Sequence, residues 1–110
     1  MLLAIDIGNT HTTFGVFDKD KLRATWRLTT GIHRTVDEHA ALLLNLLHLR
    51  GLDKSDITDV ALCSVVPPVA PVFEQLFQSY FNISTFVIGA GVKTGVRIRM
   101  DNPREVGPDR

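Results

Sequence analysis

Residues 2–30, LLAIDIGNTHTTFGVFDKDKLRATWRLTT, contain three runs that favour β-structure and two short connections between them. Residues 2–7 are apolar except for Asp6, which is typical of a buried strand. Residues 12–18 place Phe14 and Val16 on one side of a strand, and residues 21–30 alternate apolar with polar side chains, as expected of a strand that has one face toward solvent. Because the connections are as short as tight turns, the sequence predicts three antiparallel strands in a meander.

A helix is predicted after the meander. Thr35 and Glu38 fit a capping box, in which the side chain of each accepts a hydrogen bond from the backbone of the other, and Gly51 is a typical terminating glycine. Apolar residues at helical spacing line two neighbouring faces. The first face comprises Val36, Ala40, Leu43, Leu44 and Leu47, and the second comprises Leu42, Leu46 and Leu49. Because a sheet covers only one side of a helix, the second face is expected to make another internal contact or a subunit interface.

The remaining pattern alternates strands and helices. Residues 57–66 are almost all apolar and predict a central strand. Pro67–Pro68 end this strand and can start the helix that follows, because proline suits the first helical position. A helix is predicted over residues 69–81 and a further strand over residues 84–89. The order β-β-β-α-β-α-β therefore predicts an α/β domain with a mixed sheet flanked by helices. Beyond this sheet, glycine and charged residues predict a loop that includes a short exposed strand from Val96.

Composition excludes several classes of protein. The chain has 110 residues, 45% hydrophobic and 22% charged, as in globular proteins, and its formal net charge is zero. It therefore lacks a general attraction to nucleic acid or anionic membranes, and no apolar run approaches the roughly 18 residues that span a bilayer. The single cysteine, Cys63, excludes an internal disulfide and is expected to be a small buried thiol. Without a signal-peptide pattern, we expect a cytoplasmic protein with neither a nucleic-acid nor a membrane partner.

The polar stretch DIGNTHTTFG at residues 6–15 has two interpretations. In a hairpin turn, Gly8 and Asn9 would tolerate positive φ angles. In a phosphate-binding loop, the same backbone amides would form an anion nest, and Asp6 at the strand end would hold a hydrated Mg²⁺. A hairpin does not require a carboxylate at this position, and the lysine-containing P-loop pattern is absent. The hydroxyl groups available to phosphate oxygens are those of Thr10, Thr12 and Thr13.

A second candidate site is VGPDR at residues 106–110. A kinase that acts on an alcohol needs a carboxylate that orients the hydroxyl and accepts its proton, and Asp109 is suited to that role. Arg110 would pair with a substrate carboxylate or phosphate. Asp101 and Glu105 are rival carboxylates, and a solvated surface loop is the alternative interpretation of the whole segment.

Other polar residues are assigned less specific positions. The histidines lack metal-ligand spacing, and His39 and His48 are expected on a helix surface or at an interface. Ser64 ends the central strand and either faces a cleft or is a buried, hydrogen-bonded serine. Because the chain stops directly after a Gly-Pro turn and a charged pair, we expect it to be the N-terminal part of a longer protein.

Three motifs together resemble those of type III pantothenate kinases, over the whole length of the chain. They are DIGNTHTTFG (6–15), SVVP (64–67) and TGVRIRMDNPREVGPDR (94–110), in the same order and at similar spacing. The resemblance implies an RNase H-like domain over residues 1–110, one half of an actin-like two-domain kinase whose second domain is absent from this chain. This domain would include the first phosphate loop (6–13) and the start of the pantothenate-binding segment (96–110).

The resemblance also implies a reaction, its cofactors and its residues. The reaction is ATP-dependent phosphorylation of pantothenate, the first step of coenzyme A biosynthesis, by a homodimer that requires Mg²⁺ and a monovalent cation, K⁺ or NH4⁺. The implied phosphate-loop residues are Asp6, Ile7, Gly8, Asn9, Thr10, His11, Thr12 and Thr13, with Asp6 contacting Mg²⁺ through water. The implied substrate residues are Met100, Gly107, Pro108, Asp109 and Arg110, with Asp109 as the catalytic proton acceptor. Ligands of the monovalent cation are implied to lie outside this chain.

Two residues depart from the family pattern. Met100 stands where many members have an aromatic residue, and Pro108 stands where alanine is common. Three other functions stay open at this point: a nucleotide-binding regulatory or accessory protein on the same scaffold, a kinase for another small alcohol such as a sugar, and a dimerisation domain.

Overall fold

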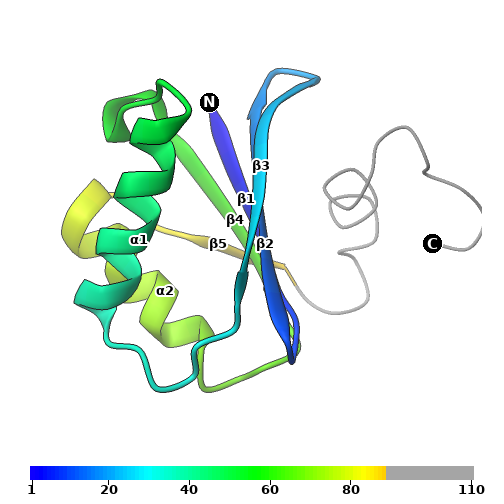
Figure 1. Ribbon diagram of the computed structural model, residues 1–110, viewed down its shortest axis with the longest axis vertical. Helices are drawn as coiled ribbons and strands as arrows, with labels where there is room; N and C mark the ends of the chain where they lie inside the picture. The colour runs from blue at the N-terminus through cyan, green and yellow to red at the C-terminus, as the bar shows by residue number, and fades with distance from the viewer. Residues whose placement is uncertain (89–110) are drawn as a thin grey trace, which may run out of the picture.

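The computed structural model describes residues 1–88, which form a five-stranded sheet with helices on one side (Figure 1). The elements are β1 (Leu2–Ile7), β2 (His11–Asp18), β3 (Lys21–Thr29), α1 (Val36–Leu49), η1 (Lys54–Asp56), β4 (Asp59–Ser64), α2 (Ala70–Leu76), η2 (Phe77–Phe81) and β5 (Phe86–Ile88). This order confirms the predicted succession of strands and helices. Residues 89–110, with the predicted segment 96–110, lie outside the described residues.

The sheet is mixed, as predicted, and its strand order is β3-β2-β1-β4-β5. The meander pairs β1 with β2 and β2 with β3 in antiparallel fashion, whereas β4 is parallel to both β1 and β5. The parallel pairs require crossover connections, which α1 and α2 provide on the same side of the sheet (Figure 1). β1 is consequently central, and its last residues lie between β2 and β4.

The main core lies between the sheet and the helices. Leu3, Ile5 and Ile7 of β1 are completely buried there and pack in one cluster with Leu43 of α1 and Phe73 of α2. Because side chains alternate across a strand, Leu2, Ala4 and Asp6 lie on the opposite face of the sheet. A smaller cluster on that face contains Ala4 and Phe17, with Leu2 and Leu22 against them.

Local sequence signals define both ends of α1. The Glu38 amide donates to Oγ1 of Thr35 over 3.1 Å, and the Thr35 amide donates to Oε1 of Glu38 over 2.8 Å, so the predicted capping box is formed. Gly51 follows the helix with φ +73°, a conformation that favours glycine. The second apolar face is divided, because Leu46 packs against the core whereas Leu49 is 68% exposed.

His39 is not on the helix surface, so that prediction was wrong. It lies four residues before Leu43 and therefore shares the buried face of α1. Its ring centroid is 4.7 Å from that of Phe73, and neither ring nitrogen has a hydrogen-bond partner among the described residues. Burial is the largest effect and lowers the pKa of His39; the charge of Arg34 acts in the same direction, whereas the Gly31 backbone and Glu38 act in the opposite direction.

Several element boundaries differ from the predictions: β4 ends at Ser64 instead of residue 66, and β5 spans Phe86–Ile88 instead of residues 84–89. β4 begins at Asp59 instead of residue 57, because Asp53 and Asp56 exchange capping hydrogen bonds around the short helix η1. α2 begins at Ala70 and has Pro71 in its first turn, so Pro67–Pro68 only form the turn that precedes it. The predicted second helix continues into the π-helical turn η2. No helix among residues 1–88 is both long and apolar enough to cross a membrane.

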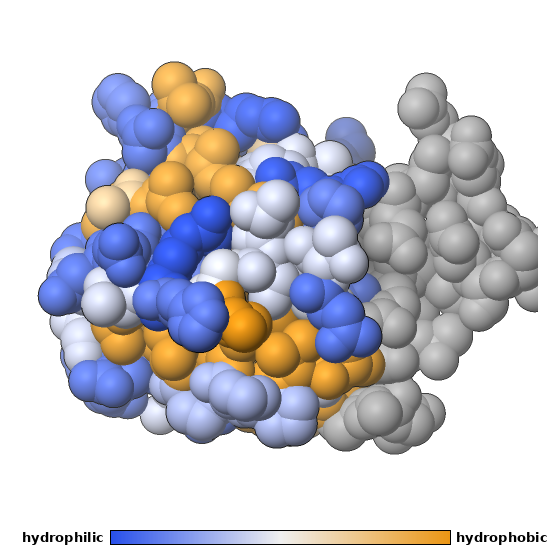
Figure 2. Space-filling view, turned by 60° about the horizontal axis from the view of Figure 1, so that its bottom comes forward, coloured by the Kyte–Doolittle hydropathy of each residue, from blue (hydrophilic) through white to orange (hydrophobic). Residues whose placement is uncertain are grey.

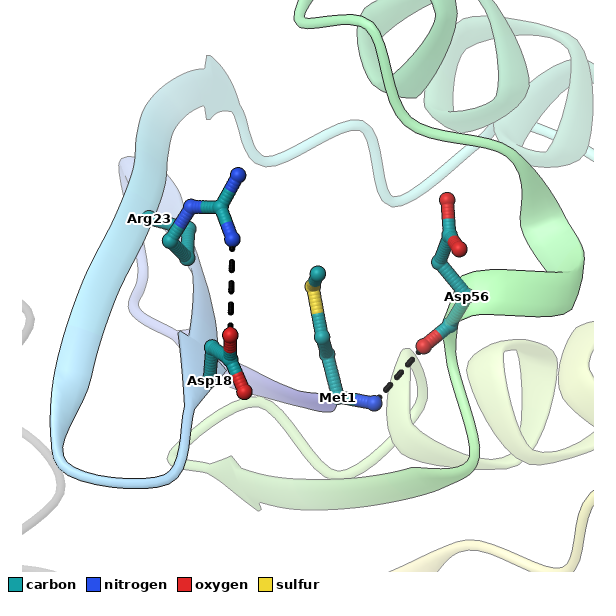
Figure 3. Close-up of polar contacts among 4 residues, drawn as sticks. All are labelled: Met1, Asp18, Arg23 and Asp56. Carbon is teal, nitrogen blue, oxygen red and sulfur yellow. Dashed lines mark hydrogen bonds and ion pairs between the residues drawn. The ribbon is translucent and has the colours of Figure 1, made fainter.

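Figure 3 shows two polar contacts at the end of the sheet where β1 begins. The Met1 ammonium donates to the carbonyl oxygen of Asp56 over 2.7 Å and thereby links the start of β1 to the segment before β4. Arg23 and Asp18 form an ion pair across the β2–β3 turn, with an N–O distance of 3.4 Å. An exposed pair of this kind contributes about 0–1 kcal/mol, so the apolar core contributes far more to stability.

Candidate functional site

Four chain segments meet at the edge of the sheet where β1 ends. Register pairs join Ile7 of β1 to Thr12 of β2 and to Ser64 of β4, while His11 pairs with Thr29 of β3. The β1–β2 hairpin and the connections that follow β3 and β4 therefore lie at one edge. Figure 2 turns this end toward the viewer and shows hydrophobic surface beside hydrophilic surface.

Residues 8–11 form the turn of the β1–β2 hairpin, in agreement with the hairpin interpretation of the sequence. The Gly8 amide donates to the His11 carbonyl over 2.9 Å. Within residues 1–88 only Lys19, Gly51 and Asn82 have positive φ angles, so Gly8 and Asn9 do not use the positive φ that their residue types tolerate. An anion nest that relies on a left-handed residue is therefore not formed at these positions.

Gly8 is needed for a different reason, which is space. A Cβ atom at this position would lie 3.0 Å from the carbonyl oxygen of His11, closer than such contacts normally are. A Cβ atom at residue 8 would force the His11 carbonyl to move by a few tenths of an ångström, so glycine permits the close approach of the two backbone segments. The absence of a side chain at residue 8 thus allows the loop to be narrow, without a positive φ angle.

Asp6 lies at the end of β1 on the face opposite the helices and is 6% exposed. The sheet register places it between Thr13 of β2 and Cys63 of β4. The Cys63 thiol donates to Oδ1 of Asp6 over 3.3 Å. Cys63 is buried, as predicted, but its contact with the candidate metal ligand was not anticipated, because the pairing of β1 with β4 is not visible in a local pattern.

Thr12 and Thr30 join the hairpin to the end of β3. Thr12 is 3% exposed, and its Oγ1 lies 2.9 Å from Oγ1 of Thr30. The Thr30 hydroxyl donates to the Gly8 carbonyl over 2.7 Å, and the Thr30 amide donates to the Thr10 carbonyl over 2.8 Å. Thr30 was not among the predicted site residues; its only signal in the sequence is a hydroxyl at a strand end.

The other predicted loop residues occupy different environments. Ile7 is completely buried in the core, so only its backbone is available at the site, and its carbonyl accepts from the Val65 amide over 3.0 Å. Asn9, Thr10 and His11 are exposed, and Thr13 is half-buried on the face of the sheet that carries Asp6.

Ser64 is engaged within its own turn. Its hydroxyl donates to the Val66 carbonyl over 3.0 Å and accepts from the Val66 amide over 2.9 Å. Ser64 is therefore hydrogen-bonded, as one of the two interpretations expected, but it is half-buried instead of buried. This turn directs the chain from β4 toward α2.

The polar groups at this edge are suited to a hydrated Mg²⁺ ion that also binds phosphate groups. Mg²⁺ is commonly held by one or two carboxylates together with water and substrate phosphates, and Asp6 offers one carboxylate. No group of three or more His, Cys, Asp or Glu residues able to enclose a metal occurs among the described residues. The amides of Asn9 and Thr10 donate to no other residue within positions 1–88, so they are suited to bind phosphate oxygens.

The second predicted motif lies outside the described residues. Met100 and residues 107–110 belong to the segment that the structure does not describe. Their distance from Asp6, and the role of Asp109 as a proton acceptor, stay predictions.

Comparison with known proteins identifies the family. The family model described as type III pantothenate kinase matches residues 2–110. The chain belongs to the type III pantothenate kinase family. A type III pantothenate kinase of Dehalococcoides mccartyi is 50% identical over 109 residues, which are 99% of this chain and 42% of the relative. One from Listeria welshimeri is 46% identical over 110 residues, 100% of this chain and 42% of the relative. The chain thus spans well under half the length of these type III pantothenate kinases.

Solved structures with low sequence identity share the fold. A ROK hexokinase from Thermus thermophilus has a TM-score of 0.58 and 14% identity, covering 80% of this chain and 34% of that one. A putative N-acetylglucosamine kinase from Porphyromonas gingivalis has a TM-score of 0.57 and 22% identity, covering 81% of this chain and 34% of that one. The predicted mixed sheet flanked by helices is confirmed, and the same fold occurs within these two solved structures.

Proposed function

We propose that this chain is the N-terminal part of a type III pantothenate kinase, which transfers the γ-phosphoryl group of ATP to the hydroxyl of pantothenate. The observation that carries the proposal is the family match over residues 2–110, because that range includes both the hairpin beside Asp6 and the segment 107–110. The product, phosphopantothenate, is the first intermediate on the route to coenzyme A.

In this proposal, the hairpin is the first phosphate loop. The amides of Asn9 and Thr10 and the Thr10 hydroxyl donate to phosphate oxygens, and Ile7 contributes only its backbone. Asp6 holds Mg²⁺ through water, while Thr13 borders the carboxylate on the same face. The bound Mg²⁺ neutralises negative charge on the phosphates of ATP. This assignment is supported by the burial of Asp6 at the strand end and by the narrow turn at Gly8.

The segment that follows position 88 supplies the acceptor side of the reaction. Asp109 orients the pantothenate hydroxyl and takes its proton as the oxygen attacks the γ-phosphorus and ADP leaves. Arg110 pairs with the pantothenate carboxylate. Gly107 and Pro108 shape the backbone around Asp109, and Met100 contacts the substrate in place of an aromatic residue.

We further propose the architecture of the whole enzyme. Residues 1–110 are the N-terminal RNase H-like domain, and a second domain clamps ATP against loop 6–13 and supplies the ligands of K⁺ or NH4⁺. The greater length of the relatives supports this second domain. The enzyme is a cytoplasmic homodimer, and the exposed Leu49 of α1 offers apolar surface for an interface.

The test uses the full-length enzyme and its Asp109→Asn variant. The wild type is expected to phosphorylate pantothenate, and the variant to lose about 100- to 10,000-fold in kcat because its general base is gone. Near wild-type turnover in the variant would refute the role of Asp109. ATP binding without turnover of any acceptor would favour the regulatory alternative, and turnover of a sugar instead of pantothenate would favour another kinase of the same fold.

A further inference from the structure

Thr30 makes three hydrogen bonds to the β1–β2 hairpin. Its hydroxyl contacts the Gly8 carbonyl (2.7 Å) and the Thr12 hydroxyl (2.9 Å), and its amide contacts the Thr10 carbonyl (2.8 Å). Thr30 directly follows β3, so these bonds tie the end of an outer strand to the loop beside the central strand. Thr30 therefore holds both chain segments of the hairpin, at Gly8 on one segment and at Thr10 and Thr12 on the other, from the side of β3.

The hydrogen atoms in this network can be assigned from its chemistry. A threonine hydroxyl has one proton, and a carbonyl oxygen only accepts. The Thr30 proton must therefore go to the Gly8 carbonyl, and the contact between the two threonines must use the proton of Thr12. In this arrangement the proton of the Thr12 hydroxyl is used within the protein, and the hydroxyl supports Thr30.

Peptide geometry extends the effect of Thr30 to two amides. In a trans peptide the C=O and N–H bonds point in opposite directions within one plane. Holding the Gly8 carbonyl toward Thr30 directs the Asn9 amide away from it. Holding the Thr10 carbonyl toward the Thr30 amide likewise directs the His11 amide away. Within residues 1–88 the His11 amide does not donate to the Gly8 carbonyl. That carbonyl accepts from the Thr30 hydroxyl.

We propose that Thr30 is a positioning residue that directs the Asn9 amide, one of the two proposed phosphate donors of the hairpin, toward the phosphates of ATP. Thr30 does not touch the nucleotide; it acts by fixing two peptide planes of the hairpin. Thr12 supports it by donating to the Thr30 hydroxyl from a buried position. The inference rests on the proposed function, because it assumes that the hairpin binds ATP.

The test compares three variants in the full-length enzyme. Thr30→Val removes the hydroxyl at similar volume, Thr30→Ser retains it, and Thr29→Val alters the exposed neighbour as a control. Thr30→Val is expected to raise the KM for ATP about tenfold, the effect of one lost hydrogen bond, with the KM for pantothenate unchanged. Thr30→Ser and Thr29→Val are expected to resemble the wild type.

A second measurement tests the positioning without relying on catalysis. Amide hydrogen exchange at Gly8, whose N–H closes the hairpin, is expected to become about tenfold faster in Thr30→Val and to stay unchanged in Thr29→Val. If Thr30→Val folds poorly, Thr12→Val tests the same network and is expected to change exchange at Gly8 in the same direction.

The outcomes separate this inference from the proposed function. An unchanged KM for ATP with unchanged exchange at Gly8 would overturn the role of Thr30, as would equal increases in the KM values for both substrates. If the wild type does not phosphorylate pantothenate, the proposed function fails, and ATP affinity in the same variants, measured by calorimetry, then decides the role of Thr30 alone.

Discussion

The Cys63 thiol donates to Oδ1 of Asp6 across the parallel pair of β1 and β4, with an Sγ–Oδ1 distance of 3.3 Å. Both side chains are buried, so water competes little for this contact. The thiol is a weak donor, but a carboxylate at a buried strand end benefits from any group that fixes its orientation. Cys63 therefore helps to orient the carboxylate proposed to hold hydrated Mg²⁺.

Removing the thiol is expected to weaken the metal site. In the full-length enzyme, Cys63→Ala should raise the Mg²⁺ concentration needed for half-maximal activity and lower the free energy of unfolding by about 1 kcal/mol, the value of one hydrogen bond. Cys63→Ser keeps a donor and should retain the wild-type Mg²⁺ dependence. A magnesium titration and urea unfolding measure both effects. The same Mg²⁺ dependence in Cys63→Ala as in the wild type would show that the thiol only fills space.

Replacing Asp6 itself tests the metal site directly. Asp6→Asn keeps the shape of the side chain but removes its negative charge, so we expect a loss of at least about 100-fold in kcat, comparable to other electrostatic contributions to catalysis. The control is Asp59→Asn, which changes an exposed carboxylate at the far end of β4 and should have wild-type kinetics. Full activity of Asp6→Asn at low Mg²⁺ would remove Asp6 from the site.

Gly8→Ala is expected to alter ATP binding more than Gly51→Ala does. A Cβ atom at residue 8 would crowd the His11 carbonyl at 3.0 Å, whereas nothing lies within 4 Å of one at Gly51. Gly51→Ala instead strains a backbone with φ +73° and should cost about 1 kcal/mol of stability without changing the KM for ATP. Thermal unfolding and ATP kinetics separate the two effects. Equal KM values for ATP in both variants would contradict the role of the narrow hairpin.

The buried His39 predicts a pH dependence of stability. Its pKa is lowered from 6.5 by burial, so in the acid range the unfolded chain binds a proton that the folded chain excludes. Stability should therefore fall as the pH decreases below the ordinary pKa of 6.5, and His39→Leu should make the curve flatter there. Urea unfolding at a series of pH values measures this difference. An equally steep decline in His39→Leu would assign the dependence to other groups.

Predictions succeeded where the signal is local. The capping box of Thr35 and Glu38 and the stop at Gly51 depend on residues a few positions apart, and both were confirmed. The apolar run of residues 2–7 predicted β1 with its observed bounds, Leu2–Ile7. At His39 the apolar spacing of α1 pointed to a buried position, but the polarity of histidine led to the wrong expectation.

The sequence alone determined the α/β class, the order of elements and the position of Asp6 at a strand end, because alternation, helical spacing and caps are local properties of the chain. Tertiary structure decided which distant residues meet. It brought Cys63 to Asp6 across 57 positions and Thr30 to Gly8 across 22. Such contacts follow from strand order and register, which are set by the burial of all apolar faces together, and no local pattern carries that information.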